Sequence, residues 1–291
     1  MSDLLDGEAI RAWIEGAALH LIDIHTHSFA DPIARRAIEA FEKSTGTQAH
    51  LSGTTSDLRR SMEKTGIVLS VIQPIATKPA QVRAINTWAG EISGDGLLPF
   101  ATLYPGQSDW EAEVEEIRCA GFKGVKLHPD YQEFDPDDRA LFPMYEKLQA
   151  EDLIVLIHAG DDMSFPPPGR ATPKQVSSLV GHFPDLRIIV AHLGGFRMWD
   201  AVEEYLVGKD VYLDTCYTVG FLETKRITRI MERHGFERIL FGTDSPWKDQ
   251  KEEIDHIARL AIPDEAKCQI LGGNAARLLD LRFPQEQIKS S

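Results

Sequence analysis

The 291-residue chain has few cysteines, and none of them is placed for a disulfide framework or a cysteine-based zinc site. The chain has three cysteines, Cys119, Cys216 and Cys268, which is an odd number. They are widely separated, and no CxxC pair is present. Disulfide-stabilised secreted domains and structural zinc sites both require paired cysteines at short spacings. The cysteine pattern therefore excludes both classes of protein and is compatible with a reducing compartment.

Long hydrophobic runs are absent as well. The longest, Ile67–Ile75 and Leu153–Ile157, are far shorter than the roughly 20 apolar residues that span a bilayer. The first residues, MSDLLDGEAIRAWIEG, carry acidic side chains where a secretory signal needs a basic flank and an unbroken apolar segment. We therefore expect a cytoplasmic protein with no membrane association.

Positive charge is scarce. The sequence has 31 Lys and Arg against 45 Asp and Glu, which gives a formal net charge of −14. Such a charge repels phosphate backbones, and no basic strip with interleaved aromatic residues is present. We expect a small-molecule substrate rather than a nucleic acid, while a homo-oligomer is compatible with the sequence.

What the sequence does have is a regular series of short apolar runs, rich in Val, Ile and Leu. Their starts lie 25 to 46 residues apart, which is about the length of one strand, one helix and two loops. Strands buried on both faces and separated by helices form parallel sheets. The eight runs are Leu21–Ile24, Ile67–Ile72, Leu97–Leu103, Phe122–Leu127, Leu153–Ile157, Leu186–Ala191, Val211–Leu213 and Ile239–Phe241.

Eight such runs favour a closed (β/α)8 TIM barrel of the α/β class, although an open doubly wound sheet has the same periodicity. No linker rich in Gly, Ser or Pro divides the chain, so we predict one domain over residues 1–291, with the barrel at about 21–262 and C-terminal helices packed outside it at 263–281. Capping boxes at Ser108–Glu111 and Thr172–Gln175 predict two helix starts. Pro143 predicts a helix that kinks or begins late.

Histidines gather where these strands end. His25, His27, His128, His158 and His192 all fall at or just past the carboxyl end of an apolar run, and so does Asp244. Barrel enzymes build their active sites at that end of the strands. The side chains of His25 and His27 share one face of a strand, as a metal site requires. A single histidine there is commonly a structural residue, but the ordered set predicts a metal centre.

The motifs that carry this set resemble the amidohydrolase superfamily, and specifically its amidohydrolase-2 branch of TIM-barrel metal-dependent hydrolases. The resemblance extends from about Leu21 to Leu281. It is carried by Asp23-Ile-His25-Thr-His27, Ile157-His158-Ala-Gly160, Val190-Ala-His192-Leu-Gly-Gly195, Phe241-Gly-Thr-Asp244 and Ile270-Leu-Gly-Gly-Asn274-Ala-Ala-Arg277.

The resemblance implies that His25, His27 and His158 are metal ligands and that Asp244 is both a ligand and the general base. It implies that His192 either binds a second metal or polarises the substrate. One or two divalent cations are expected per chain, with zinc as the default. Asp23 is a candidate acceptor for an imidazole N–H of the site.

Lys126 is open to two interpretations. As a carboxylated lysine it would bridge two metals, and as an ordinary cation it would bind a substrate carboxylate. His128, Arg170 and Trp247 are predicted to contact the substrate, although a strand-end histidine, a solvated loop arginine and a rim tryptophan need no such role. Cys216 is expected to be a small packing residue.

The sequence therefore predicts a hydrolase of a small molecule with an amide, lactone or ester-type bond. Water activated by the metal would attack, and Asp244 would accept its proton. One alternative is a decarboxylase of the same branch, which keeps the histidines and the aspartate on one metal. Two others are a TatD-type nuclease, which the acidic composition disfavours, and a barrel that binds without catalysis.

Overall fold

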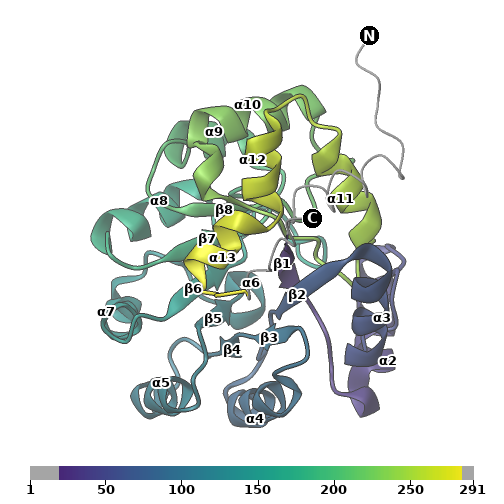
Figure 1. The fold of residues 1–291 in the computed structure, drawn as a ribbon. Helices are drawn as coiled ribbons and strands as arrows, with labels where there is room; N and C mark the ends of the chain where they lie inside the picture. The colour runs from purple at the N-terminus through teal and green to yellow at the C-terminus, as the bar shows by residue number, and fades with distance from the viewer. Residues whose placement is uncertain (1–19, 284–291) are drawn as a thin grey trace.

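The computed structural model describes residues 20–283, and these form a (β/α)8 barrel (Figure 1). All paired strands are parallel. The eight predicted runs all contain strand. The strands are β1 (Leu21–Thr26), β2 (Ile67–Ile72), β3 (Leu97–Pro99), β4 (Ala101–Thr102), β5 (Gly124–Leu127), β6 (Ile154–Ile157), β7 (Ile188–Val190), β8 (Tyr212–Asp214) and β9 (Ile239–Leu240).

The barrel has nine strand segments because the third strand is interrupted at Phe100, which separates β3 from β4. The segments β1–β3 and β4–β9 form two hydrogen-bonded sheets. The two sheets join again between the last strand and the first, where the Ile24 amide donates to the Phe241 carbonyl at 2.9 Å and the Asp244 amide donates to the His25 carbonyl at 2.8 Å. Asp244 is thereby placed beside His25 by the backbone itself.

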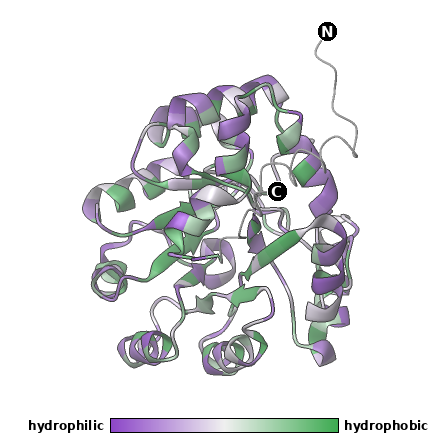
Figure 2. Cartoon of the chain, viewed as in Figure 1, coloured by the Kyte–Doolittle hydropathy of each residue, from purple (hydrophilic) through white to green (hydrophobic). Residues whose placement is uncertain are grey.

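Helices surround the strands, with hydrophilic residues outward and the hydrophobic strands inside (Figure 2). Within residues 20–283, no helix has the length and hydropathy needed to cross a membrane. The α-helices are α2 (Asp31–Thr45), α3 (Thr55–Thr65), α4 (Val82–Ile92), α5 (Trp110–Cys119), α6 (Pro129–Gln132), α7 (Phe142–Ala150), α8 (Pro173–His182), α9 (Trp199–Tyr205), α10 (Thr224–His234), α11 (Gln250–Ala258), α12 (Asp264–Cys268) and α13 (Asn274–Leu278). Shorter turns are η1 (Pro79–Gln81), η2 (Arg139–Leu141), η3 (Phe236–Arg238) and the π-helical η4 (Gln269–Gly273).

The predicted helix starts are partly correct. Thr172 forms its capping box with Gln175, whose amide donates to the threonine hydroxyl at 3.3 Å. The box predicted at Ser108 is wrong, because α5 begins after Asp109 without a side-chain cap. Pro143 occupies the first turn of α7, where a missing N–H is tolerated, and this helix begins late as predicted.

The C-terminal helices close one end of the barrel. Ala275, Leu278 and Leu279 pack against the same apolar cluster as Ile22 and Ile24 of β1. Asn274 fixes this segment, because its Nδ2 donates to the carbonyls of Phe236 and Ile239 at 2.7 and 2.6 Å. These helices thus cover one end of the barrel, where α13 lies across the strands in Figure 1.

Candidate metal centre

The carboxyl ends of the strands bring seven predicted residues to one cavity of about 960 Å³. Each of the seven lines this cavity, and all except His27 are buried. They come from the ends of β1, β5, β6, β7 and β9, which lie far apart in the sequence but meet at one mouth. They are His25, His27, Lys126, His128, His158, His192 and Asp244.

Three of them form the centre of the cluster. Asp244 Oδ1 lies 3.0 Å from His27 Nε2 and 3.6 Å from His25 Nε2. Lys126 Nζ lies 3.2 Å from the same His25 Nε2. Two imidazoles and a carboxylate therefore direct ligand atoms at one point, with an amine beside them.

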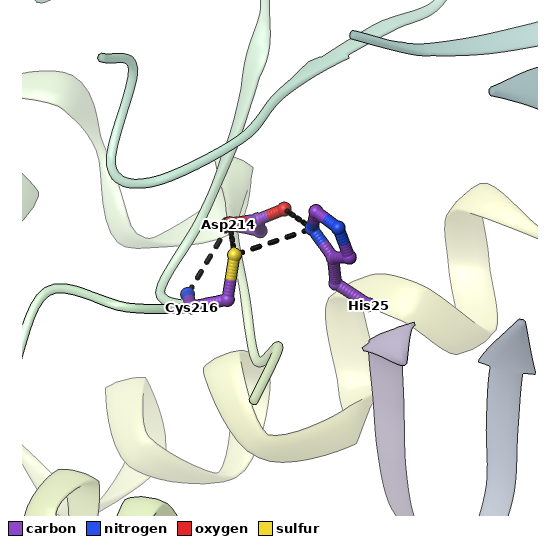
Figure 3. A group of neighbouring side chains, drawn as sticks. All are labelled: His25, Asp214 and Cys216. Atoms are coloured by element: carbon purple, nitrogen blue, oxygen red, sulfur yellow. Dashed lines mark hydrogen bonds and ion pairs between the residues drawn. The ribbon is translucent and has the colours of Figure 1, made fainter. Parts of the chain in front are cut away.

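The Nδ1 atoms of His25 in β1 and of His27 directly after it each lie within hydrogen-bond distance of a protein oxygen. His25 Nδ1 lies 2.8 Å from Asp214 Oδ2, as Figure 3 shows, and His27 Nδ1 lies 2.8 Å from the Gln73 carbonyl. An acceptor at Nδ1 keeps the proton on that nitrogen, so the Nε2 lone pair faces the cavity. This is the arrangement that metal-binding histidines have.

Asp214 takes the role that the sequence suggested for Asp23. The Asp23 carboxylate accepts from the Thr243 hydroxyl at 2.6 Å and from Gln250 Nε2 at 2.8 Å, and it reaches no imidazole. The pairing of β1 with β2 has a register irregularity between Asp23 and Thr26, the segment that contains His25.

Cys216 contacts two histidines of the site. Its Sγ lies 3.2 Å from His25 Nδ1 and 2.9 Å from Asp214 Oδ1 (Figure 3). The same Sγ lies 3.2 Å from His192 Nδ1. Burial, with Asp214 and Asp244 nearby, raises the pKa of the Cys216 thiol well above its usual value. The expected packing role is thus accompanied by polar contacts with the site.

His158 and His192 form a second pair across the mouth. His192 Nε2 lies 3.0 Å from His158 Nδ1. His158 Nε2 is buried and has no hydrogen-bond partner among the described residues. A buried polar atom without a partner is costly, so its presence at a cavity wall indicates a ligand.

His128 lies parallel to His158, with 4.1 Å between ring centroids, and its Nε2 lies 3.3 Å from Asp162 Oδ2. His128, His158 and Asp162 each offer a ligand atom, and these atoms lie within 4.8 Å of one another. They form a second group of potential metal ligands beside the one made by His25, His27 and Asp244.

Burial sets the protonation states. It lowers the pKa of His25 and His158 well below the usual value, with Lys126 and neighbouring histidines adding to the effect. It lowers the pKa of His128 to about 4 despite the neighbouring Asp162. Burial alone would raise the pKa of Asp244, but the hydrogen bond from His27 and the nearby His25 lower it strongly. Neutral imidazoles and an ionised carboxylate are the forms that bind a divalent cation.

Two site residues have strained backbones. His192 has a φ of 61° and Asp244 a φ of 65°, in the left-handed region that favours glycine. These torsions direct both side chains into the mouth from the ends of their strands. Strained residues of this kind cluster at functional sites.

The substrate contacts predicted in the loops divide into two cases. Trp247 lines the cavity and stacks on Phe41, with 3.8 Å between ring centroids. Arg170 is absent from the lining; its Nη1 instead lies 3.7 Å from Asp135 Oδ1, and both side chains are about half exposed. A solvated loop position therefore describes Arg170 better than a substrate contact.

Three residues of the site escaped prediction. Asp214 ends β8 as the histidines end their strands, so the same rule applied to Leu213-Asp214 would have found it. Asp162 and Gln73 lie in loops past β6 and β2, and no sequence pattern marks them.

A comparison with protein families gives one match over nearly the whole chain. The family model described as Amidohydrolase matches residues 22–281.

Solved structures with the same fold include enzymes of known reaction. The 5-carboxyvanillate decarboxylase of Sphingomonas paucimobilis is 17% identical with a TM-score of 0.69, over 91% of this chain and 100% of that one. A dihydroxybenzoic acid decarboxylase of Polaromonas, with bound manganese and the inhibitor 2-nitroresorcinol, is 20% identical with a TM-score of 0.70, over 91% and 98%. An uncharacterised TIM-barrel protein of Bordetella bronchiseptica is 21% identical with a TM-score of 0.73, over 90% and 99%. At these identities the likeness shows a shared fold.

Proposed function

This chain belongs to the amidohydrolase family, and from that premise we propose that it is a metal-dependent decarboxylase of a small aromatic carboxylic acid. The observation that carries the proposal is the state of Lys126. Its side chain is 1% exposed, and among the described residues no carboxylate lies within 4.0 Å of its Nζ. A buried ammonium with no carboxylate at ion-pair distance is unfavourable, and a substrate carboxylate would supply that direct partner.

The comparisons support the same reaction class. Two of the similar structures carry names of decarboxylases whose substrates, carboxyvanillate and dihydroxybenzoic acid, are hydroxylated benzoic acids. The hydrolase predicted from the sequence has less support from these names. We therefore place the decarboxylase first.

The residues fit a divalent cation. His25, His27 and Asp244 offer ligand atoms within 4.8 Å of one another, and the unpartnered Nε2 of His158 faces the same cavity. A cation held there would supply positive charge to a substrate oxygen. Zinc suits these nitrogen and oxygen ligands, and manganese, which one similar structure contains, suits the carboxylate.

The chain's own groups have distinct tasks in this reaction. Lys126 binds the carboxylate and holds it against the cavity wall. The bond from the ring carbon to the carboxylate breaks, CO2 leaves, and the electron pair remains on the ring. Asp244 transfers a proton, taken from water, to that carbon, and the hydroxide left from the water combines with the released CO2 to give bicarbonate. His192 hydrogen-bonds a ring oxygen of the hydroxylated acid.

One observation favours hydrolysis as the second candidate. Burial lowers the pKa of Lys126 to about 8 although Asp244 lies nearby, so a fraction of this amine is neutral near neutral pH. A neutral lysine amine can react with CO2 to form a carbamate, and such a group bridges two metals. Hydrolysis of a lactone or amide would then be the expected reaction.

Metal analysis and product analysis distinguish the two candidates. The purified protein would be assayed for metal per chain, then incubated with hydroxybenzoic acids and, separately, with aryl lactones and amides. About one equivalent of metal and CO2 release from an acid would support the decarboxylase. Two equivalents and cleavage of a lactone or amide would replace it with the hydrolase.

Lysine variants test the residue that carries the proposal. Lys126→Met is expected to abolish CO2 release, while Lys123→Met, at an exposed position three residues earlier, retains it. Full activity in Lys126→Met would contradict the proposed role of this amine.

A further inference from the structure

The cavity at the metal centre continues outward as an apolar groove. One wall is a face of α2 that presents Ile33, Ala37, Ala40 and Phe41, which recur at helical spacing. Ile33 is 53% exposed, whereas Phe41 at the inner end of this face packs against the protein core. A second face of the same helix, at Ala34 and Ile38, packs inward instead.

Another wall comes from η1 and from α4. In Figure 1, α4 lies at the lower edge and α2 at the right. This wall presents Ala80, Ala84, Ile85 and Trp88. Ala80 and Ala84 are exposed, and Ile85 and Trp88 are half-buried. The groove between the two helices is thus lined by apolar side chains that have contact with solvent.

Small residues give this groove its width. Ala37 and Ala40 on α2, and Ala80 and Ala84 on the other wall, all line the cavity. A larger residue at any of these positions would extend into the space between the helices. The small alanine side chains therefore leave room in the cavity at these four positions.

Among the described residues that line the cavity, a single lysine or arginine side chain is present. Lys126 is the one lysine among the described lining residues, and none of them is an arginine. The remaining charged lining groups are Asp161, Asp162 and Asp244. A second carboxylate on the substrate would meet no lysine or arginine side chain of the lining in the groove, which favours an uncharged outer part of the substrate.

From these observations we infer that the substrate is a monocarboxylic acid whose apolar aryl or alkyl extension lies in the groove between α2 and α4. The inference rests on the proposed function, which places the carboxylate at Lys126. The groove is continuous with the metal centre in one cavity, so one molecule can occupy both ends. Burial of each methylene against these walls strengthens binding.

Calorimetric titration of the purified, metal-loaded protein with 4-methyl-, 4-butyl-, 4-hexyl- and 4-octylbenzoate tests this inference. The Kd is expected to fall about two- to fourfold for each added methylene until the groove is filled. Ala84→Leu and Ala37→Leu should weaken octylbenzoate binding about tenfold or more and leave methylbenzoate within about twofold. Ala112→Leu, on the exposed face of α5, is the matched control and should bind like the unmodified protein.

The outcomes separate this inference from the proposed function. These benzoates lack a ring hydroxyl, and only their binding is measured, so catalysis does not enter the result. Binding of every member with the same Kd would overturn the apolar subsite and leave the carboxylate site intact. Failure of every member to bind would overturn both.

A second copy of the chain is the competing occupant of the groove. Light scattering of the unmodified protein and of Ala84→Leu, with and without octylbenzoate, tests for it. A dimer that dissociates in Ala84→Leu or on ligand addition would assign this face to self-association and overturn the inference. An unchanged mass in all four samples, together with the chain-length dependence, would support it.

Discussion

His25 Nδ1 and Asp214 Oδ2 lie 2.8 Å apart across the barrel, joining β1 to β8. Both side chains are fully buried, and the Asp214 Oδ1 atom also accepts from the His192 amide at 2.9 Å. One carboxylate therefore orients two histidines of the candidate metal centre, one through its ring and one through its backbone.

Replacing Asp214 by Asn should weaken metal binding without removing a ligand. An amide cannot accept at both of its ends, so either His25 or the His192 amide loses its acceptor. Loss of such a partner typically weakens metal affinity about 10- to 100-fold. Retention of metal against a chelator measures this effect. Asp210→Asn, at an exposed position four residues earlier, is the control, and equal retention in both variants would show that Asp214 has no such role.

Alkylation should distinguish the cysteines of the native protein. Cys119 is exposed, whereas Cys216 is buried with a raised pKa and so remains a protonated thiol. Brief treatment with iodoacetamide followed by peptide mass mapping should show modification at Cys119 and none at Cys216. In urea both should react. Rapid modification of Cys216 in the folded protein would indicate that solvent reaches the part of the site beside His25 and His192.

Glu253 should make stability depend on pH. Burial, with Asp23 nearby, raises its pKa from 4.5 to about 8, although Lys248 opposes the shift. The folded state then binds more protons than the unfolded state between these two values, so stability falls as pH rises from 4.5 to 8.

Glu253→Gln removes this fall. Relative to the unmodified protein, the variant should gain about 2 to 4 kcal/mol in unfolding free energy between pH 5 and pH 9, at about 1.4 kcal/mol per unit of pKa shift. Urea unfolding at both pH values measures it. Glu252→Gln, at the exposed neighbouring position, should show no such gain, and an equal gain there would reject the assignment to Glu253.

Asn274 should be important for the stability of the barrel. Its Nδ2 donates to two carbonyls, and the side chain is 1% exposed. Asn274→Ala would leave both acceptors without a donor and destabilise the protein by about 1 to 3 kcal/mol. Glu265→Ala, at an exposed position of the neighbouring α12, should change stability by less than about 1 kcal/mol. Thermal or urea unfolding of both variants would decide between these expectations.

The strands were predictable because most of their residues are buried on both faces, so each strand coincides with a mainly apolar run. Periodicity did not reveal the interruption at Phe100, because a buried Phe continues the run whether or not its backbone pairs. The cap at Ser108 failed for a related reason: a sequence pattern permits a capping box but does not exclude a start one or two residues later.

The candidate site was predictable where its residues lie at strand ends, since parallel strands of a barrel bring those ends together. The identity of the carboxylate that holds His25 was not, because it depends on a contact between β1 and β8, two strands that lie far apart in the sequence. The groove between α2 and α4 was also beyond the sequence. From the sequence alone, alanines on a helix face are interpreted as ordinary helix formers, because the residues that lie across the groove are not known.

The left-handed backbone conformations of His192 and Asp244 place stability and catalysis in opposition. Glycine at either position would relieve strain of order 1 to 3 kcal/mol but delete a side chain from the mouth. Laboratory evolution that screens only for heat resistance should therefore accumulate glycine or asparagine at these two positions, producing sturdier barrels that no longer turn over substrate. A screen that also requires turnover should hold both positions fixed and gain its stability elsewhere.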